Sequence, residues 1–425
     1  MSKLIPCAAL LAAALSGCAQ LPAVDQDIDR ALQTADPRGR IDLLRRQGEE
    51  IAGVPFAGGN SVHLLRDGPA SYAAMKAAIE NARQSIEMES YWFDEVEGRD
   101  FAGLLVQARQ RGASVYLIYD AWGSIDTPKA LFDGLRAAGV QVVEFSPIDP
   151  ATLAETVVDR RDHRKLLIVD GRLVVTGGVN ISGVYLRNAE PARNPDGQPW
   201  RDTDIRIEGP VVSEYEARFR QVWQQQKGAP IGDPPPQGPQ PRGDFYLQVI
   251  ANTPALHEHA IYRSLLVAIA LSRKSVHLTT GFFAPTPDLV KALRQAARRG
   301  VDVVLIVPSR STSSLAISAG RAYYEDLLED GVHICEYQGR VLHAKTAVID
   351  GDWSSVGSSN LDYRSVVLNN EINTVILSGA FGQEMEAMFH DDLAHAKAIE
   401  MAEWKQRPFA ERWNEWRARL VDTLL

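Results

Sequence analysis

Two copies of one motif, His-x-Lys-x4-Asp-x6-Gly-Gly/Ser-x-Asn, dominate the sequence. The first copy runs from His163 to Asn180 and the second from His343 to Asn360. Because the chain holds only 9 His in 425 residues, two chance occurrences of so long a pattern can be set aside. The chain is therefore built around two equivalent sites.

Each copy predicts a β-hairpin. Residues 166–169 and 346–349 are apolar, strand-like runs, and each is followed by Asp-Gly, a strong short-range hairpin signal. Residues two apart on a strand share a face, so the His and the Lys of each motif point the same way. Asp170 and Asp350 fall at the turns, and we interpret these members of the catalytic motif as structural rather than as bases.

A two-residue Asp-Gly turn sets the predicted register. It would place Gly178 opposite His163 and Ser358 opposite His343. A small residue facing each His leaves room for a substrate. The Asn of each motif then lies just beyond the His, as a neutral donor for an anionic oxygen.

Two sets of His, Lys and Asn suit phosphodiester chemistry. Two ammonium groups and two amides at one point would neutralise a phosphodiester and the charge that grows on it in the transition state. One neutral imidazole can attack phosphorus while the other, protonated, supplies a proton to the departing alcohol. The alternative, two hairpins whose His is only a core residue, does not explain why the whole set is duplicated. The candidate catalytic residues are His163, Lys165, Asp170, His343, Lys345 and Asp350, with Asn180, Asn360 and Ser358 as phosphate-binding groups.

These motifs resemble the signature of the phospholipase D superfamily. The run 357–371, supported by 200–204 and 207–212, resembles its bacterial cardiolipin synthase branch more closely. The resemblance extends from about Gly59 to the C-terminus. The sequence departs from the pattern at Gly178, where many relatives have Ser, and lacks the two N-terminal membrane helices that many cardiolipin synthases carry.

The resemblance implies a ping-pong mechanism through a phosphohistidine. It makes His163 the nucleophile and His343 the acid and base. It also implies that an acidic residue downstream of each motif orients a His, and these residues map to Glu371 and Asp202. No cofactor and no metal are expected.

The chain is an internal duplication with one motif in each half. The strand-like run 85–93 resembles 275–283, and each leads to a helix ending in Arg-Gly and then to an apolar strand. This alternation predicts an α/β sandwich in each half. Because neither half holds a full site, the halves must pack around a pseudo-twofold axis, with the active site at their seam. The predicted division is a signal peptide at 1–17, a spacer at 18–58, halves at 59–227 and 244–379 joined by a Pro/Gly-rich linker at 228–243, and a C-terminal amphipathic helical segment at 380–425.

Two further segments are distinctive. The stretch before the first motif His is longer than its counterpart, which predicts an insertion at 147–158 that borders the substrate entrance. Near the C-terminus, Trp404, Trp413, Trp416 and Leu420 fall close to one face of a helix. We expect this face to dock on the body of the protein rather than on a membrane.

The N-terminus predicts a lipid anchor. An apolar stretch at 4–15 follows Lys3 and leads to Leu-Ser-Gly-Cys18, which is typical of a bacterial lipobox. The stretch is shorter than the about 20 residues that span a bilayer. Cys18 is therefore expected to be acylated and to hold the protein on the periplasmic face of a membrane. Ala19 follows the Cys where inner-membrane lipoproteins often carry Asp, which favours the outer membrane.

The net charge of the chain narrows the range of functions that we expect. The net charge is −9, from 54 acidic and 45 basic residues, and an acidic surface disfavours nucleic-acid binding, which is led by phosphate neutralisation. We therefore expect a phosphatidyltransferase of cardiolipin synthase type that acts on phospholipids such as phosphatidylglycerol. The alternatives are a phospholipase D that releases phosphatidic acid, and a non-catalytic lipid-binding lipoprotein, against which the intact His and Lys of both motifs argue.

Replacement of Cys18 tests the anchor. Cys18→Ser removes the thiol that would be acylated, so we expect an unacylated chain that retains its signal peptide. Mass spectrometry of the N-terminal peptide shows whether the chain is acylated and whether the signal peptide has been removed. Cys7→Ser, which changes a Cys upstream of the cleavage point, should leave acylation and processing intact. An acylated Cys18→Ser chain would contradict the prediction.

Overall fold

A computed structural model describes residues 21–34, 39–148, 160–186, 197–232, 240–311 and 313–419. The predicted signal peptide and Cys18 lie outside these residues. So do most of the predicted insertion at 147–158 and the middle of the predicted linker.

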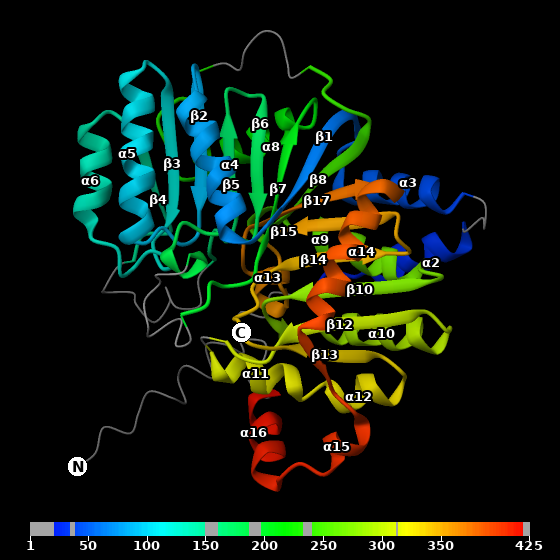
Figure 1. Ribbon diagram of the computed structural model, residues 1–425. Coiled ribbons are helices and arrows are strands. Elements are labelled where there is room, and N and C mark those ends of the chain that lie inside the picture. The colour runs from blue at the N-terminus through cyan, green and yellow to red at the C-terminus, as the bar shows by residue number, and fades with distance from the viewer. Residues whose placement is uncertain are drawn as a thin grey trace, which may run out of the picture.

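One 16-stranded sheet runs through both halves of the molecule (Figure 1). The first half contributes β1 (Ala57–Arg66), β2 (Ser85–Ser90), β3 (Ser114–Asp120), β4 (Gln141–Phe145), β5 (Lys165–Val169), β6 (Leu173–Gly177) and β7 (Thr203–Glu208). The second half contributes β8 (Phe245–Thr253), β9 (Glu258–His259), β10 (Ser275–Thr280), β12 (Asp302–Pro308), β13 (His333–Tyr337), β14 (Lys345–Ile349), β15 (Trp353–Gly357), β17 (Glu371–Leu377) and β18 (Ala396–Ala398).

The strand order repeats around one central joint. It reads β18-β13-β12-β10-β14-β15-β17-β8-β1-β7-β6-β5-β2-β3-β4, with β9 beside β8. Strands β8 and β1 pair antiparallel at the centre, and the strands on either side follow the same sequence outward in each half. The predicted α/β class with two halves related by a pseudo-twofold axis is therefore confirmed, and the halves share a single sheet.

Helices cover both faces of this sheet. One face carries α4 (Asp67–Asn81), α5 (Val96–Gln110) and α6 (Lys129–Ala137) in the first half, and α9 (Ala260–Ala270), α10 (Pro287–Arg298) and α12 (Tyr324–Glu329) in the second. Helix α11 (Ser314–Arg321) contacts the short strand β11 instead. The other face carries α8 (Val212–Gln225) and α14 (Gly379–Ala394). The smaller elements are α2 (Asp25–Gln33), α3 (Arg40–Ala52), η2 (Gly183–Tyr185), η3 (Pro254–Leu256), β11 (Phe283–Ala284), β16 (Leu361–Asp362), α13 (Tyr363–Val367), α15 (Met401–Lys405) and α16 (Phe409–Arg419).

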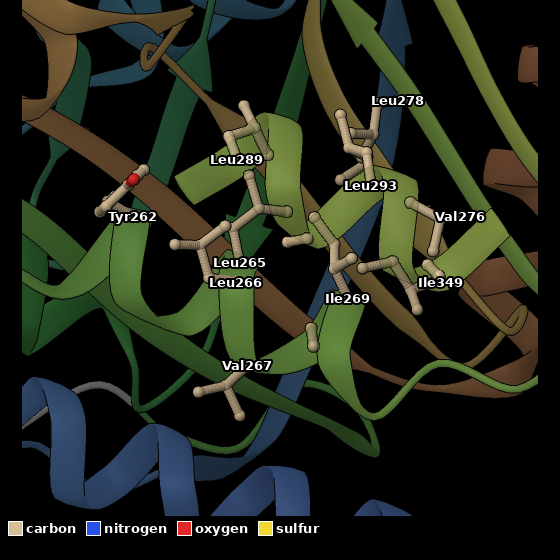
Figure 2. Packing of buried hydrophobic residues seen from close by; sticks show 14 of the residues in the cluster. Tyr262, Leu265, Leu266, Val267, Ile269, Val276, Leu278, Leu289, Leu293 and Ile349 are labelled. Atoms are coloured by element: carbon tan, nitrogen blue, oxygen red, sulfur yellow. The ribbon is translucent and has the colours of Figure 1, made fainter. Parts of the chain in front are cut away.

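The apolar residues of these elements form separate cores. In the second half, α9 packs against α10 and against β10 and β14 through residues such as Leu266, Leu293, Val276 and Ile349 (Figure 2). A third core lies under α8 and α14 and takes residues from both halves. Alternate residues of each strand face opposite layers, so burial on both faces explains the nearly continuous apolar runs.

The predicted spacer and the C-terminal segment both contact the second half. Helices α2 and α3 lie against α9, and Asp27 of α2 accepts hydrogen bonds from Arg263 at 2.7 and 2.9 Å. Trp404 is buried against Tyr324. Trp413, which was expected to dock on the body, is instead exposed, as is Trp416. None of the helices among the described residues is long and apolar enough to cross a bilayer.

The predicted register of the motif hairpins is wrong by one residue. Val169 pairs with Leu173 and Ile349 pairs with Trp353, so each turn has three residues instead of two. Asp170 has a left-handed φ of 53°, like the Gly that follows it, and its backbone N–H donates to the carbonyl of Ser85 at 2.9 Å, beside the neighbouring strand β2. This conformation directs its carboxylate at a distant segment of the chain.

That carboxylate holds the hairpin to the strand beside it. Asp170 accepts hydrogen bonds from the backbone N–H groups of Arg83, Gln84 and Ser85, the Gln84 bond being 2.7 Å. Asp350 makes the same three bonds to residues 273–275 and a 2.9 Å ion pair with Arg40 of α3. The repeated arrangement supports a structural role for the motif aspartates.

We expect Asp170→Asn to destabilise the fold. The amide is isosteric but uncharged, so the charge-assisted bonds to three N–H groups weaken at a cost of about 1–3 kcal/mol. Urea-induced unfolding measures the change. Asp133→Asn, at an exposed ion pair with Arg136, is the control and should shift stability by less than about 0.5 kcal/mol. Equal effects at the two positions would refute the structural role.

Candidate active site

The backbone brings each motif into the other half of the molecule. The N–H of His163 donates to the carbonyl of Asn370 at 2.9 Å, and the N–H of His343 donates to the carbonyl of Arg201 at 2.8 Å. Asn370 and Arg201 immediately precede the two predicted orienting acids. Each His is therefore placed beside the acid strand of the opposite repeat.

The side chains complete this crossover. His163 Nδ1 lies 3.0 Å from Glu371 Oε1 and 3.1 Å from Oε2. His343 Nδ1 lies 2.6 Å from Asp202 Oδ2. All four side chains are buried. A carboxylate at Nδ1 fixes the tautomer in which Nδ1 carries the proton, which leaves Nε2 as the reactive nitrogen.

Two serine hydroxyls hold Glu371 in place. Ser365 Oγ donates to Oε1 at 2.9 Å, and Ser358 Oγ donates to Oε2. The sequence predicted Ser358 as a phosphate-binding residue, but the structure directs its hydroxyl proton to this carboxylate. Ser365 was not predicted at all, because nothing in its sequence context marks it as part of the site.

The pocket of Asp202 is built differently. A Cβ at Gly178 would lie 2.0 Å from Asp202 Oδ1, so only Gly leaves room for this carboxylate. The hydroxyl of Tyr185 lies 3.2 Å from His343 Nδ1 and accepts a 3.2 Å hydrogen bond from Asn180. Gly178 and Ser358, where the sequence predicted space for a substrate, thus each lie against the acid of their own repeat, and that acid binds the His of the other repeat.

Aromatic rings enclose both imidazoles. Tyr91 lies edge-on to His163 with ring centroids 4.9 Å apart, and the ammonium of Lys165 lies 5.2 Å from the Tyr91 ring. Trp200 lies 5.4 Å from His343. Tyr91 lies in the run 85–93, which the sequence predicted only as a strand, so its place beside His163 was not predicted.

The two motif lysines lie in the same buried site. Burial lowers the pKa of Lys165 to about 7 and that of Lys345 to about 8. Each ammonium donates to the carbonyl of its motif His. Both lysines also act electrostatically on each His. This mutual influence places both motifs in one site.

Burial and the nearby lysines keep both imidazoles neutral. Burial, followed by the charges of Lys165 and Lys345, places the pKa of His163 well below its usual range. Burial and Lys345 lower the pKa of His343 to about 3. The resting site therefore holds two neutral imidazoles.

The two acids differ in charge. Burial raises the pKa of Glu371 to about 7. Burial opposes ionisation of Asp202 as well, but His343 and Lys345 outweigh it and lower the pKa of Asp202 below its usual value. Asp202 is therefore the more strongly ionised partner.

The two motif asparagines also differ. Asn180 is held by Trp92, whose backbone N–H donates to its Oδ1 at 3.1 Å, and by Tyr185. Asn360 Oδ1 is buried without a hydrogen-bond partner among the described residues. Asn360 also lines, with Lys345, a cavity of about 40 Å³ in the second half. Asn360 is thus the less constrained of the two amides.

No cluster of three His, Cys, Asp or Glu side chains able to hold a metal ion occurs in the described part of the chain. The site offers a set of groups suited to an anionic oxygen: two ammonium groups, two imidazoles and an amide.

The fold and the paired His-Lys motifs define a phospholipase D-like protein, and the comparisons with known proteins agree. The family model described as "Cardiolipin synthase, PLD-like domain" matches residues 75–223 and 265–393. The cardiolipin synthase of Alkalihalophilus pseudofirmus is 31% identical over 391 residues, which cover 91% of this chain and 76% of that protein. Cardiolipin synthase A of Serratia proteamaculans is 35% identical over 375 residues, covering 87% of this chain and 75% of the relative. The chain therefore belongs to the phospholipase D-like cardiolipin synthase family, as its motifs predicted.

A solved structure shows the same fold. The phosphatidylserine synthase of Haemophilus influenzae Rd KW20 aligns with a TM-score of 0.65 and covers 91% of this chain and 100% of its own. Its sequence is only 13% identical. The likeness therefore concerns the arrangement of the two repeats.

We expect the site to bind anions less tightly as pH rises through the pKa values of its lysines and Glu371. Deprotonation of Lys165 and Lys345 removes positive charge, and ionisation of Glu371 adds negative charge, so all three changes act in the same direction. Calorimetric titration with a dialkyl phosphate, whose charge is constant in this range, measures the dissociation constant. Lys345→Met should weaken binding and remove the upper part of the pH dependence. A dissociation constant that does not change with pH would contradict the charges assigned here.

Proposed function

We propose that this protein is a phosphatidyltransferase of cardiolipin synthase type that transfers a phosphatidyl group to a glycerol-type hydroxyl. One observation carries the proposal. Two motif imidazoles, each bound to a carboxylate of the other repeat, share one buried site with two lysines. The chain also resembles cardiolipin synthases over most of its length. The substrates we propose are phospholipids, with phosphatidylglycerol as donor.

The proposed reaction has two displacement steps. In the first, His163 Nε2 attacks phosphorus, the bond from phosphorus to the departing alcohol breaks, and His343 gives that alcohol a proton. In the second, His343 takes a proton from the incoming hydroxyl, whose oxygen attacks phosphorus while the bond to His163 breaks. The first step exchanges a P–O ester bond for a P–N bond to His163, and the second exchanges that P–N bond for a new P–O ester bond, so no other co-substrate is needed.

The different acid pockets support this assignment of roles. A charged carboxylate stabilises an imidazolium, and Asp202 is the more strongly ionised acid, at 2.6 Å from His343. Glu371 is engaged by two hydroxyls and has a raised pKa, so it orients His163 while favouring the neutral, nucleophilic form. His343 therefore suits proton transfer and His163 suits attack.

The negative charge of the bound substrate would allow His343 to become protonated. In the free site, burial and then the charges of Lys345 and Lys165 depress the pKa of His343. A bound phosphodiester monoanion would offset these two charges and raise the pKa of the imidazole. The acid would then form only when the phosphate is in place.

Hydrolysis is the nearest alternative. Water in place of the acceptor would release phosphatidic acid, and transfer prevails only where the site excludes water and positions the acceptor. The burial of both motif His and both motif Lys side chains favours transfer. A non-catalytic lipid-binding lipoprotein is the second alternative, and the hydrogen-bonded acids at both His argue against it.

We also propose that acylated Cys18 anchors the protein on the periplasmic face of a bacterial membrane, the outer membrane being favoured by Ala19. The lipobox sequence supports the anchor. Lipid substrates would then lie in the membrane to which the enzyme is attached.

We expect His163→Ala and His343→Ala each to reduce turnover by at least about 1,000-fold, because each removes a group that bonds to phosphorus or transfers a proton. Phosphatidylglycerol vesicles are the substrate, and mass spectrometry separates cardiolipin, glycerol and phosphatidic acid. The intact enzyme should yield mainly cardiolipin. An enzyme that retains His163 but lacks His343 should accumulate the phosphatidyl adduct.

The matched control is His390→Ala, an exposed helix residue. Phosphatidic acid as the main product at high acceptor concentration would establish hydrolysis instead. An adduct on His343 would reverse the roles of the two imidazoles. Near-normal activity of either motif variant would refute the mechanism.

A further inference from the structure

The helix α16 carries an aromatic stripe that no other described element covers. Phe409, Trp413 and Trp416 have 79%, 48% and 52% of their surface exposed. Their rings stack in succession, with centroids 6.3 and 5.0 Å apart. Residues four and three apart lie on one face of a helix, so the three rings form a continuous apolar stripe. We call these residues the α16 stripe.

The opposite face of α16 is fixed to the body. At 100° per residue, Ala418 lies on the far side of the helix from the stripe. Ala418 is buried against Ala319 of α11 and Ala284 of β11. The stripe is therefore turned away from the protein, and it cannot fold back without breaking this contact.

Charge is divided around the same helix. Arg412 and Arg417 are exposed and lie on either side of the stripe at helical spacing, while Glu411 and Glu415 lie on the side nearer the body. Glu415 is buried and paired with Arg407. Aromatic residues flanked by arginines suit the interface of an anionic bilayer, where rings enter the headgroup layer and guanidinium groups bind phosphates. An aqueous surface gives such a stripe no comparable partner.

The α16 stripe is also connected to the active site. Ala284 of β11 pairs with Asp362 of β16, two residues after Asn360. Helix α11, on which α16 rests, follows β12, which runs parallel to β10. Strand β10 ends at Thr280, opposite Lys345. The stripe thus belongs to the same end of the second-half strands as Lys345.

The first half presents exposed apolar residues at the equivalent position. Strand β3 runs parallel to β2, which ends opposite Lys165, and Trp122 and Ile125 follow β3. Leu315 of α11 is their exposed counterpart after β12. In Figure 1, α11 lies below the lower ends of the first-half strands, and α16 lies beneath α11. Exposed apolar residues therefore flank the site from both repeats.

We propose that the α16 stripe, with Trp122, Ile125 and Leu315, docks on an anionic phospholipid bilayer and holds the opening of the active site against its surface. The inference rests on the proposed function only in taking the bilayer as the source of substrate. Docking at the site would let a lipid headgroup reach the motif residues while its acyl chains stay in the membrane. It is a contact additional to the acyl anchor proposed at Cys18.

Fluorescence quenching tests the docking directly. The full chain is mixed with phosphatidylglycerol vesicles that contain phosphatidylcholine brominated on its acyl chains, which quenches tryptophan on contact. We expect quenching that is clearly weaker in Trp413→Phe/Trp416→Phe, which keeps the stripe, removes its two indoles and leaves Trp122 as the remaining indole of the docking surface. Equal quenching in both proteins would overturn the proposal.

Activity separates docking from catalysis. Phe409→Ser/Trp413→Ser/Trp416→Ser should lower activity on vesicles by at least about tenfold, which corresponds to about 1.4 kcal/mol of binding. Its activity on short-chain phosphatidylglycerol, kept monomeric in solution, should stay within about twofold, as for other surface substitutions. Leu32→Ser/Leu256→Ser, at exposed apolar residues of α2 and η3, is the matched control. Arg412→Glu/Arg417→Glu should weaken binding to vesicles most when they are rich in phosphatidylglycerol.

Two outcomes separate failure of docking from failure of the proposed function. If the intact protein consumes neither form of phosphatidylglycerol, the proposed function fails, and quenching still decides whether the stripe docks. If quenching is absent and the serine variant converts a dimer into a monomer, a second copy covers the stripe and the bilayer proposal is wrong. Equal loss of activity on both substrates would likewise refute docking.

Discussion

The antiparallel pairing of β1 with β8 is the contact on which the whole site depends. It joins two repeats into one sheet, and it places the acid-bearing ends of β7 and β17 next to the joint. From there each acid reaches the motif of the other repeat. The core under α8 and α14 draws on both repeats, so this joint is supported by apolar burial as well as by backbone hydrogen bonds. Without it, each buried His would lose its carboxylate.

The site also shows how burial can shift the pKa values of several ionisable groups at once. Two lysines, two imidazoles and two acids lie together, and burial penalises the charged form of each. The fold offsets this penalty with pairs of opposite charge and with hydrogen bonds, such as those that two serines donate to Glu371. The pKa values of these lysines, imidazoles and acids are therefore shifted from their ordinary range. Burying the groups costs stability, which the rest of the fold offsets. An arriving phosphate then completes the charge balance.

The sequence was informative where function depends on local spacing. The motif predicted the hairpins, the shared face of His and Lys, and the two repeats, because period and turn residues are local properties. It could not predict which acid meets which His, because that depends on the order of strands far apart in the chain. The prediction of the hairpin register was wrong for a similar reason, since Asp170 accepts hydrogen bonds from residues 83–85, far from it in the sequence. The exposure of Trp413 depended on where α16 docks, which helical periodicity alone does not reveal.

The exchange of acids between repeats has a consequence for how such a site can originate. A chain with a single repeat could complete the crossover only by pairing with an identical copy, and a symmetric pair must have two identical pockets. Fusion into one chain removes that restriction. Here Gly178 corresponds to Ser358, Tyr185 to Ser365 and Asp202 to Glu371. Fusion of two repeats in one chain therefore allows the surroundings of its two imidazoles to differ.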